Sequence, residues 1–314
     1  MCFNNFVTKK DVIIFGLYYL VRYLCILNLK RMTQTTQIND FLKQSHLDWN
    51  VRTEEIVTKS GIEIPGKIAL IRDDNNESLG VHSDTYVPYQ NHELMELLFR
   101  ISQQTGLQLH TGGSFKGGQR VYAQLKSDDL KLHNDKVEGY ISGFNSFDGR
   151  TSLAFGNSNT TVSCQNTFWI GYKDVETKLR HSTNMKPKIE EILRKIDVLL
   201  VEEKETFQKI QKLGNVKIDD RIKELVTRRL FDIPKEERLD SDSLSTNKHN
   251  KLSRFAIDLN GEIQGKGDNL WGLFSGVTKY TTHSMRKGDN TEGKIFGQVG
   301  FKERQIWDSL VELV

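Results

Sequence analysis

Residues 137–155 read VEGYISGFNSFDGRTSLAF, and this stretch decides the fold class. Two β-rich runs, Val137 to Phe144 and Thr151 to Phe155, flank the pair Asp148-Gly149. An Asp-Gly pair between such runs is a strong hairpin signal, because both central positions of the turn can take a positive φ. The stretch therefore predicts two adjacent antiparallel strands joined by a tight turn.

Further strands are predicted on both sides of this hairpin. The runs are rich in β-branched and aromatic residues, and Gly, Asp or Asn residues bound them. They cover residues 62–71, 77–81, 107–111, 120–125 and 160–164. A glycine-rich segment, Gly112 to Gly118, is expected to be the loop between two of them.

Helical periodicity marks the segments around this β-rich block. Leu94, Leu97, Leu98 and Ile101 repeat at i, i+3, i+4 and i+7, which predicts a helix with one buried face that Asn91 can cap. Further helices are expected at 38–44, at 168–180, from 188 past 210, and at 218–230, 269–283 and 301–313. We therefore expect an α+β protein. An antiparallel β-rich N-terminal domain with flanking helices covers residues 32–185, and a mainly helical region covers 186–314, with a polar hinge near 235–251.

Composition excludes several classes of protein. A chain that is 37% hydrophobic, with a net charge of +3, is neither disordered nor collagen-like. Three Cys in 314 residues cannot build a disulfide framework, and Cys164 alone lies beyond residue 31, which fits a reducing compartment. Because the 44 Lys and Arg residues are nearly balanced by 41 Asp and Glu residues, nucleic-acid binding would need a local patch of cations.

The run from Val12 to Leu29 is long and apolar, and residues 1–31 are treated as an N-terminal extension. Its length is close to the roughly 20 residues of a membrane helix, but Arg22 near its middle would be costly in a bilayer. Three interpretations stay open: translation that starts at Met32, a membrane anchor, or a buried helix. A membrane is expected as a partner only if residues 12–29 are made and inserted.

Motifs for catalysis or for a cofactor are lacking in the sequence. The glycine-rich segment is followed by Gln119 and Arg120, where a Walker phosphate loop needs Lys and then Ser or Thr. The eight His residues are scattered without metal-ligand spacing. Cys164 with His181 as its base is a weak candidate, since a lone buried thiol is usually inert packing. The sequence therefore predicts no cofactor, no metal and no catalytic residue.

Six short motifs occur in the order and spacing of one protein family. They are Trp49-Asn50-Val51, Tyr86 to Asn91, Gly117-Gly118, Asn145 to Gly149, Cys164 to Thr167 and Arg180-His181-Ser182, followed by an aromatic segment from Trp271 to His283. From about Asp48 to Val314, the chain resembles a phage- and plasmid-like family of unknown function, the domain of unknown function 932. The chain departs from the expected pattern at Phe147, where His is expected, and at Ser182, where Thr is expected. The resemblance implies a mobile-element setting in the cytoplasm of a bacterial host, and it implies no reaction.

The first functional hypothesis is a nucleic-acid-binding module. The order of helix, antiparallel strands and helix is similar to the core of single-strand annealing proteins, in which a curved sheet and a helix form a basic groove. Such a groove needs cations for the backbone and aromatic rings for the bases. The candidate backbone-binding cations are Lys116, Arg120, Lys126, Arg150 and Arg180, and the rings nearby are Tyr122, Tyr140 and Phe144. The expected partner is single-stranded DNA during replication or recombination.

Two other function classes stay open. An uncharacterised enzyme would bring five polar residues into one pocket, namely Asn91, Asn145, Asp148, Asn166 and His181. The sequence shows no nucleophile with a general base to support that pocket. A non-catalytic host-interaction protein would need neither a pocket nor a groove. The apolar stripe from Ile189 to Ile210 fits self-association to a homo-oligomer as well as it fits packing in a core.

Overall fold

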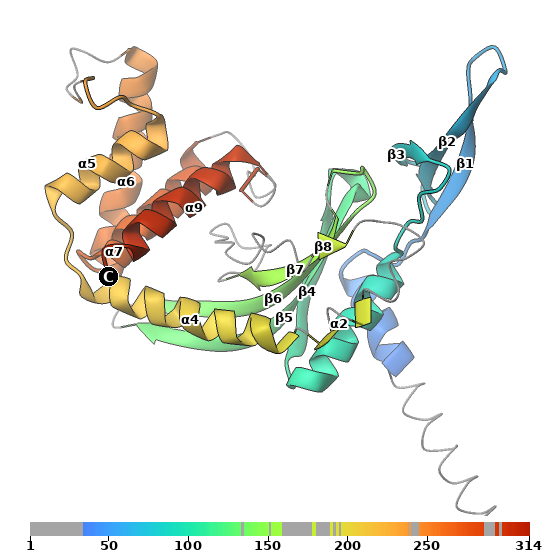
Figure 1. Ribbon diagram of the computed structural model, residues 1–314, viewed down its shortest axis with the longest axis horizontal. Helices are drawn as coiled ribbons and strands as arrows, with labels where there is room; N and C mark the ends of the chain where they lie inside the picture. Colours follow the sequence, from blue (N-terminus) through green and yellow to red (C-terminus); the bar gives the residue numbers. More distant parts are fainter. Residues whose placement is uncertain are drawn as a thin grey trace, which may run out of the picture.

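The structure is a computed structural model. It describes residues 34–132, 135–150, 152–158, 178–179, 189–190, 193–194, 196–237, 239, 245–285, 293–294 and 297–314. Within these ranges the chain forms two antiparallel sheets in its N-terminal half and a group of helices in its C-terminal half (Figure 1). This is the α+β class that the sequence predicts.

The first sheet has three strands in the order β1 (Val51–Val57), β2 (Glu63–Arg72) and β3 (Ser78–Ser83). A short helix over residues 34–44 precedes it, as expected. The polar turn between β2 and β3 contains Asn76 with a φ of 61°, a conformation that Asn tolerates better than most residues. The strands predicted at 62–71 and 77–81 are therefore confirmed.

The second sheet has five strands in chain order, and each pairs antiparallel with the next. They are β4 (Gln108–Phe115), β5 (Arg120–Leu132), β6 (Asp135–Ser146), β7 (Leu153–Ser158) and β8 (Lys178–Leu179). The turn predicted at Asp148-Gly149 joins β6 to β7, and Gly149 has a φ of 71°. The antiparallel pair is therefore confirmed, but the predicted tight turn is not: β6 ends at Ser146, β7 begins at Leu153, and Asp148 does not take a positive φ.

Two predictions beside this sheet are wrong in part. The glycine-rich segment is mostly strand: β4 pairs with β5 through Gly112 and Gly113, and only η1 (Lys116–Gly118) turns the chain. A side chain at Gly113 would meet the Tyr122 ring, so glycine there serves close packing in the strand. The helix predicted at 168–180 is wrong at its C-terminal end, because Lys178 and Leu179 form a strand that pairs with β7. The rest of that segment, and the strand predicted at 160–164, lie outside the described residues.

Helix α2 (Asn91–Thr105) buries the face that the sequence predicts, with Leu94, Leu97, Leu98 and Ile101 all buried. Its N-cap lies one residue earlier than predicted. Gln90 has extended backbone, and its N–H donates to the Glu93 carboxylate at 2.8 Å, which fixes the helix boundary at Gln90. Asn91 therefore lies inside the first turn, and its predicted capping role is wrong.

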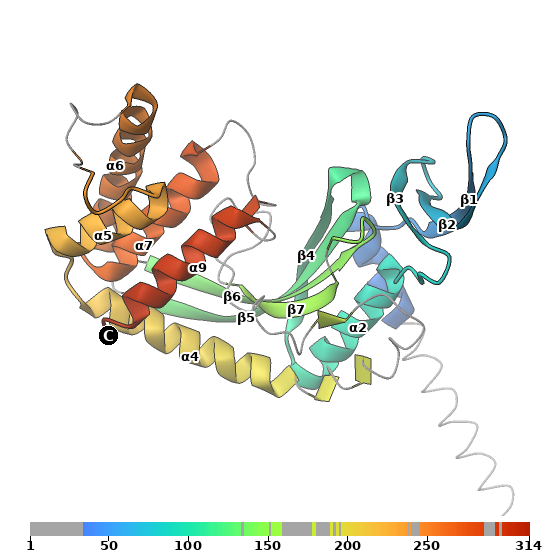
Figure 2. The same cartoon turned by 45° about the horizontal axis from the view of Figure 1, so that its top comes forward.

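Helices α2 and α4 (Ile196–Asn215) pack on the same face of the second sheet (Figure 2). Alternate residues of β5 point to opposite faces of the sheet. Val121, Ala123 and Leu125 belong to the core on the side of these helices, together with Ile141, Phe155 and Leu199. The other residues of β5, from Arg120 to Lys126, therefore form part of the opposite face.

The C-terminal half contains α5 (Asp220–Phe231), α6 (Thr246–Lys266), α7 (Leu270–Lys279), a π-helical turn η4 (Tyr280–Ser284) and α9 (Gln298–Val311). The segment at 269–283 is helical as predicted. Every residue from Leu270 to Thr278 is buried, because α7 runs between α4, α6 and α9.

The polar stretch 235–251 is not a loop throughout, since its last residues, Thr246 to Lys251, form the start of α6. Ser245 caps this helix by accepting a hydrogen bond from the N–H of Lys248. Only Phe255 and Leu259 of α6 are fully buried, so the helix carries a weak apolar stripe. A surface helix of this kind resembles a solvated loop in composition, which explains the error.

A second hydrophobic core lies among the C-terminal helices. It includes Leu130 and Val137 from the far end of the β5–β6 hairpin and Ile210 and Leu213 from α4. These two strands and this helix therefore reach from one core to the other. In the part of the chain that the structure describes, no helix has both the length and the apolar character needed to cross a bilayer. The run at 12–29 lies outside that part.

Candidate functional site

Four of the family-like motifs meet where the first sheet, α2 and the turns at one end of the second sheet come together. We call this region the motif junction; it consists of Trp49–Val51, Tyr86–Asn91, Gly117–Gly118 and Asn145–Gly149. The Trp49 ring lies 5.7 Å from the Phe147 ring and 4.2 Å from the Arg72 guanidinium. Arg72 also donates to the carbonyl of Gly117 at 2.8 Å. Segments that are far apart in the sequence are thus held in direct contact.

The two asparagines of the motif junction are engaged with the main chain. Asn91 and Asn145 are each 1% exposed. Asn91 Nδ2 donates to the carbonyls of Leu47 and Trp49, both at 3.1 Å, and Asn145 Nδ2 donates to that of Tyr89 at 2.6 Å. Buried amides of this kind satisfy carbonyls that no strand or helix pairs. The Nδ2 contacts connect the segments of the junction, while the Oδ1 atom of each asparagine is buried without a hydrogen-bond partner among the described residues.

Asp148 and Arg120 form a buried ion pair. Asp148 Oδ2 lies 3.0 Å from Arg120 Nε and 2.9 Å from Arg120 Nη2, and the side chains are only 10% and 6% exposed. Asp148 Oδ1 accepts from the main-chain N–H of Arg150 at 3.0 Å. The register that sets Arg120 opposite Ser146 places the guanidinium beneath the β6–β7 turn. Arg120, a candidate for contact with a nucleic-acid backbone, thus neutralises a carboxylate of its own chain.

His82 and Tyr86 complete this end of the sheet. Their rings stack with centroids 4.0 Å apart, and His82 Nε2 lies 2.7 Å from the Phe147 carbonyl oxygen. Tyr86 donates its hydroxyl to the carbonyl of Ser146 at 3.1 Å. Burial and the nearby Asp148 carboxylate raise the pKa of Tyr86 well above its usual range, so the hydroxyl keeps its proton. His82 cannot be recognised as part of a site from the sequence, because a lone His in a strand carries no spacing signal.

Phe147, which departs from the expected family pattern, is fully buried beside Trp49. A side chain at Gly80 of β3 would approach the Phe147 carbonyl oxygen to 2.6 Å, so the first sheet touches this turn closely. Position 147 is therefore a core position in this chain.

The face of the second sheet opposite α2 carries the predicted rings and two of the predicted cations. Cross-strand pairing sets Tyr122 beside Phe144 and Lys126 beside Tyr140, and the Lys126 ammonium lies 4.6 Å from the Tyr140 ring centre. We call these residues, with Arg120, the cation–aromatic face. Its three rings are buried, and Lys126 forms an ion pair with Asp129.

Lys116 and Arg150 are exposed in the turns at the same end of this sheet. The two turns are tied together, since the N–H of Phe147 donates to the carbonyl of Gln119 at 2.7 Å. Arg180, together with Asn166 and His181 of the proposed polar pocket and with Cys164, lies outside the described residues. Among the residues that the structure describes, no group of three or more His, Cys, Asp or Glu could hold a metal ion.

Glu203 is a buried titratable residue that the sequence does not reveal. It lies on α4, is 5% exposed, and accepts a hydrogen bond from the Ser127 hydroxyl. Burial raises the pKa of Glu203 to about 7, and the Ser127 hydrogen bond offsets part of that rise. A side chain at Gly139 of β6 would collide with its carboxylate, so glycine makes room for it.

Comparison with known proteins gives one match. A family model described as a domain of unknown function, DUF932, matches residues 78–307. No curated protein and no solved structure matches the chain. The family match begins at the first residue of β3, spans the second sheet and ends within α9. It covers more than half of the chain, and we conclude that this protein belongs to the DUF932 family.

Proposed function

We propose that this protein is a nucleic-acid-binding module that acts on single-stranded DNA in the replication or recombination of a phage, plasmid or prophage. The observation that carries the proposal is the end of the second sheet, where the exposed cations Lys116 and Arg150 lie in the turns next to the cation–aromatic face. The phage- and plasmid-like resemblance supports the mobile-element setting. The same resemblance supports a place of action in the cytoplasm of a bacterial host.

The shape of the molecule also supports this proposal. The second sheet curves between the first sheet at one end and the C-terminal helices at the other, with α2 and α4 beneath it (Figure 2). A curved sheet with cations at its margin can follow the backbone of a single strand. Such binding needs no base-specific contacts, so it tolerates changes of sequence.

Burial decides which residues carry the contacts to DNA in this proposal. The three rings of the cation–aromatic face are buried, and Arg120 and Lys126 have carboxylate partners. Phosphate contacts therefore fall first to the exposed Lys116 and Arg150. Arg180 remains a candidate from the sequence. Binding that relies on phosphates more than on stacked bases depends steeply on salt.

The test is fluorescence anisotropy of the full chain with labelled single-stranded and duplex oligonucleotides of about 20 nucleotides across a salt series. We expect preferential binding of the single strand. Charge reversal at two positions, Lys116→Glu with Arg150→Glu, should weaken binding at low salt by at least about tenfold. It should also lower the slope of log K against log salt by about 1 to 2.

The matched control reverses two exposed lysines on the first sheet and its hairpin, Lys59→Glu with Lys67→Glu. It changes the net charge by the same amount but lies away from the second sheet. Equal losses in both double variants would mean that only net charge matters, which would contradict a groove at this sheet. If neither oligonucleotide binds at low salt, the proposed function is wrong.

The alternative of a polar-pocket enzyme receives less support. Of its five residues, Asn91 and Asn145 donate to main-chain carbonyls, and Asp148 pairs with Arg120. Side chains held in this way are poorly placed to move a proton or to attack a substrate. The described members of that pocket therefore favour a binding module.

A further inference from the structure

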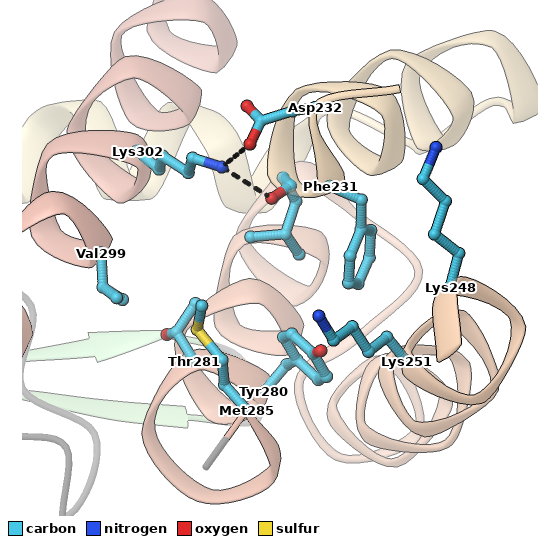
Figure 3. A pocket seen from close by; sticks show the side chains of 10 residues that line it. Phe231, Asp232, Lys248, Lys251, Tyr280, Thr281, Met285, Val299 and Lys302 are labelled. Atoms are coloured by element: carbon cyan, nitrogen blue, oxygen red, sulfur yellow. Dashed lines mark hydrogen bonds and ion pairs between the residues drawn. The ribbon is translucent and has the colours of Figure 1, made fainter. Parts of the chain in front are cut away.

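The C-terminal helices line a pocket of about 400 Å³ (Figure 3), and none of its lining residues belongs to a strand or to the motif junction. Its walls come from the end of α5, the first turns of α6, the π-helical turn η4 and the first turns of α9. The volume lies within the roughly 300–1,000 Å³ that is typical of small-molecule sites. None of the predicted site residues lines it, but Tyr280 and Thr281 belong to the family-like aromatic segment from Trp271 to His283.

One wall of the pocket is aromatic and well fixed. Phe231 and Tyr280 line it, and Phe255 packs behind them. The three rings meet edge to face, with centroids 5.3 to 5.7 Å apart. Phe255 and Tyr280 are buried, so the rings cannot turn freely. A fixed aromatic wall suits a flat aromatic ligand.

The charge of the pocket is positive. Three lysines and one aspartate line it, which gives a formal charge of +2. Lys302 forms an ion pair with Asp232, and Lys248 binds Glu237 outside the pocket at 2.8 Å. Lys251 instead extends toward Phe231 and Tyr280, as Figure 3 shows. Among the described residues no carboxylate pairs with Lys251, so its ammonium is placed to receive an anion.

The wall around Thr281 is held by a buried ion pair. Lys294 and Glu303 lie 3.1 Å apart and are 1% and 3% exposed. The Thr281 hydroxyl donates to the Glu303 carboxylate, and Lys294 donates to the Thr282 hydroxyl at 2.6 Å. These contacts fix the π-helical turn, a rare conformation that is frequent at functional sites. The turn contributes Tyr280 and Thr281 to the pocket, so the binding surface is organised before a ligand arrives.

We propose that this pocket binds a phosphorylated nucleoside, with the base against Phe231 and Tyr280 and the phosphate at Lys251. A phosphomonoester carries a charge of about −1.5 to −2 at pH 7, and Lys251 offers it a cation that no carboxylate among the described residues pairs with. Lysine serves as a point charge for phosphate. The same chemistry occurs in a free nucleotide and at the 5′-phosphorylated end of a DNA strand. The pocket is separate from the cation–aromatic face, so this proposal does not rest on the proposed function.

The test is isothermal titration of the full chain with four probes: deoxyadenosine monophosphate, deoxyadenosine, inorganic phosphate and benzoate. We expect saturable binding of the nucleotide, and binding at least about tenfold weaker for each other probe. No saturable binding of the nucleotide would overturn the proposal. Equal affinity for inorganic phosphate would also overturn it, because the aromatic wall would then contribute nothing. Equal affinity for benzoate would show that a carboxylate suffices and would overturn the phosphate assignment.

Two variants locate the binding. Lys251→Ala should weaken nucleotide binding by about tenfold or more, and Phe231→Leu should weaken it by about threefold to tenfold. The control is Lys212→Ala, which removes an exposed lysine from α4 and should leave binding unchanged. A Lys251→Ala chain that binds the nucleotide as tightly as the native chain would contradict the assignment.

Two oligonucleotides, one with a 5′-phosphate and one with a 5′-hydroxyl, distinguish the sources. A preference of at least about tenfold for the 5′-phosphate would identify a strand end as the ligand, whereas equal affinities would identify a free nucleotide. The variant Lys116→Glu with Arg150→Glu separates the two proposals. It should weaken oligonucleotide binding while leaving titration with the mononucleotide unchanged.

Discussion

At the motif junction, Asn145 donates to a main-chain carbonyl and Asp148 pairs with Arg120, whereas in the C-terminal pocket Lys251 extends into open volume beside Phe231. Both regions combine polar groups with aromatic rings. At the junction, the described polar side chains are turned toward other parts of the chain. In the pocket, a cation and an aromatic wall face a space that a ligand can fill.

This difference between the motif junction and the pocket shows how the spacing of motifs relates to function. Four of the family-like motifs coincide with the places where the first sheet, α2 and the second sheet contact one another. Spacing of this kind is explained by the Asn91 and Asn145 amides, whose Nδ2 groups donate to main-chain carbonyls of other segments. The pocket draws its residues from four helix ends and needs no such spacing. A motif can therefore report a structural constraint, whereas only Tyr280 and Thr281 of the pocket come from a family-like segment.

The contrast between the motif junction and the pocket is tested most strongly at Arg120, where we expect the largest effect on stability. Replacing Arg120 with Ala leaves the Asp148 carboxylate buried without its partner, and we expect the free energy of unfolding to fall by about 3 to 5 kcal/mol. Urea denaturation of the native and variant chains measures this loss. Arg150→Ala, an exposed neighbour whose main chain alone contacts Asp148, should change stability by no more than about 0.5 kcal/mol. If Arg120→Ala costs less than about 1 kcal/mol, the pair is not structural, and Arg120 returns as a candidate for contact with phosphate.

A second buried carboxylate sharpens the comparison, because Asp148 has an arginine partner and Glu203 accepts only a hydroxyl donor in the contacts described. Burial raises the pKa of Glu203 from 4.5 to about 7. Below pH 4.5 the group is protonated in the folded and unfolded chains. As the pH rises, the unfolded chain releases the proton first, so the native chain loses stability. The loss is complete above about pH 7 and amounts to about 3 kcal/mol.

Glu203→Gln removes this titration, since a neutral amide pays no charge-burial cost at any pH. We therefore expect the native chain to lose more stability than the variant between pH 5 and pH 8, as measured by urea denaturation at each pH. Glu205→Gln makes the same change on the exposed side of α4 and should give a profile parallel to that of the native chain. Parallel profiles for Glu203→Gln as well would show that Glu203 titrates normally.

Local patterns predicted much of the fold. The Asp148-Gly149 turn and the buried face of α2 each depend on residues that lie within one turn or one helix. Glu203 could not be foreseen in the same way. The partners that bury it, Ser127 and Gly139, come from β5 and β6, far from α4 in the sequence. Helix α6 was missed because its exposed surface has the composition of a loop.

The candidate site was predictable only in part. The alternation of β5 and β6 placed Tyr122, Tyr140 and Phe144 on one face, as the sequence analysis required for its groove. The sequence could not show that these rings are buried, nor that Arg120 would find Asp148 across the β6–β7 turn. Those outcomes depend on the positions of main-chain carbonyls and of neighbouring turns. The pocket was invisible for the same reason, since Phe231, Lys251 and Tyr280 meet only after the helices pack.

We expect only a small effect on stability at Lys251. The variant Lys251→Ala tests whether the pocket residues, unlike those of the motif junction, are dispensable for folding. Lys251 is exposed, and no described carboxylate pairs with it, so Lys251→Ala should change the free energy of unfolding by no more than about 0.5 kcal/mol. Deoxyadenosine monophosphate should raise the melting temperature of the native chain and not that of the variant, because a ligand stabilises only the state that it binds. Scanning calorimetry with and without nucleotide measures both quantities. A large loss of stability without nucleotide would mean that Lys251, like Arg120, holds the fold together, and the contrast between the two regions would disappear.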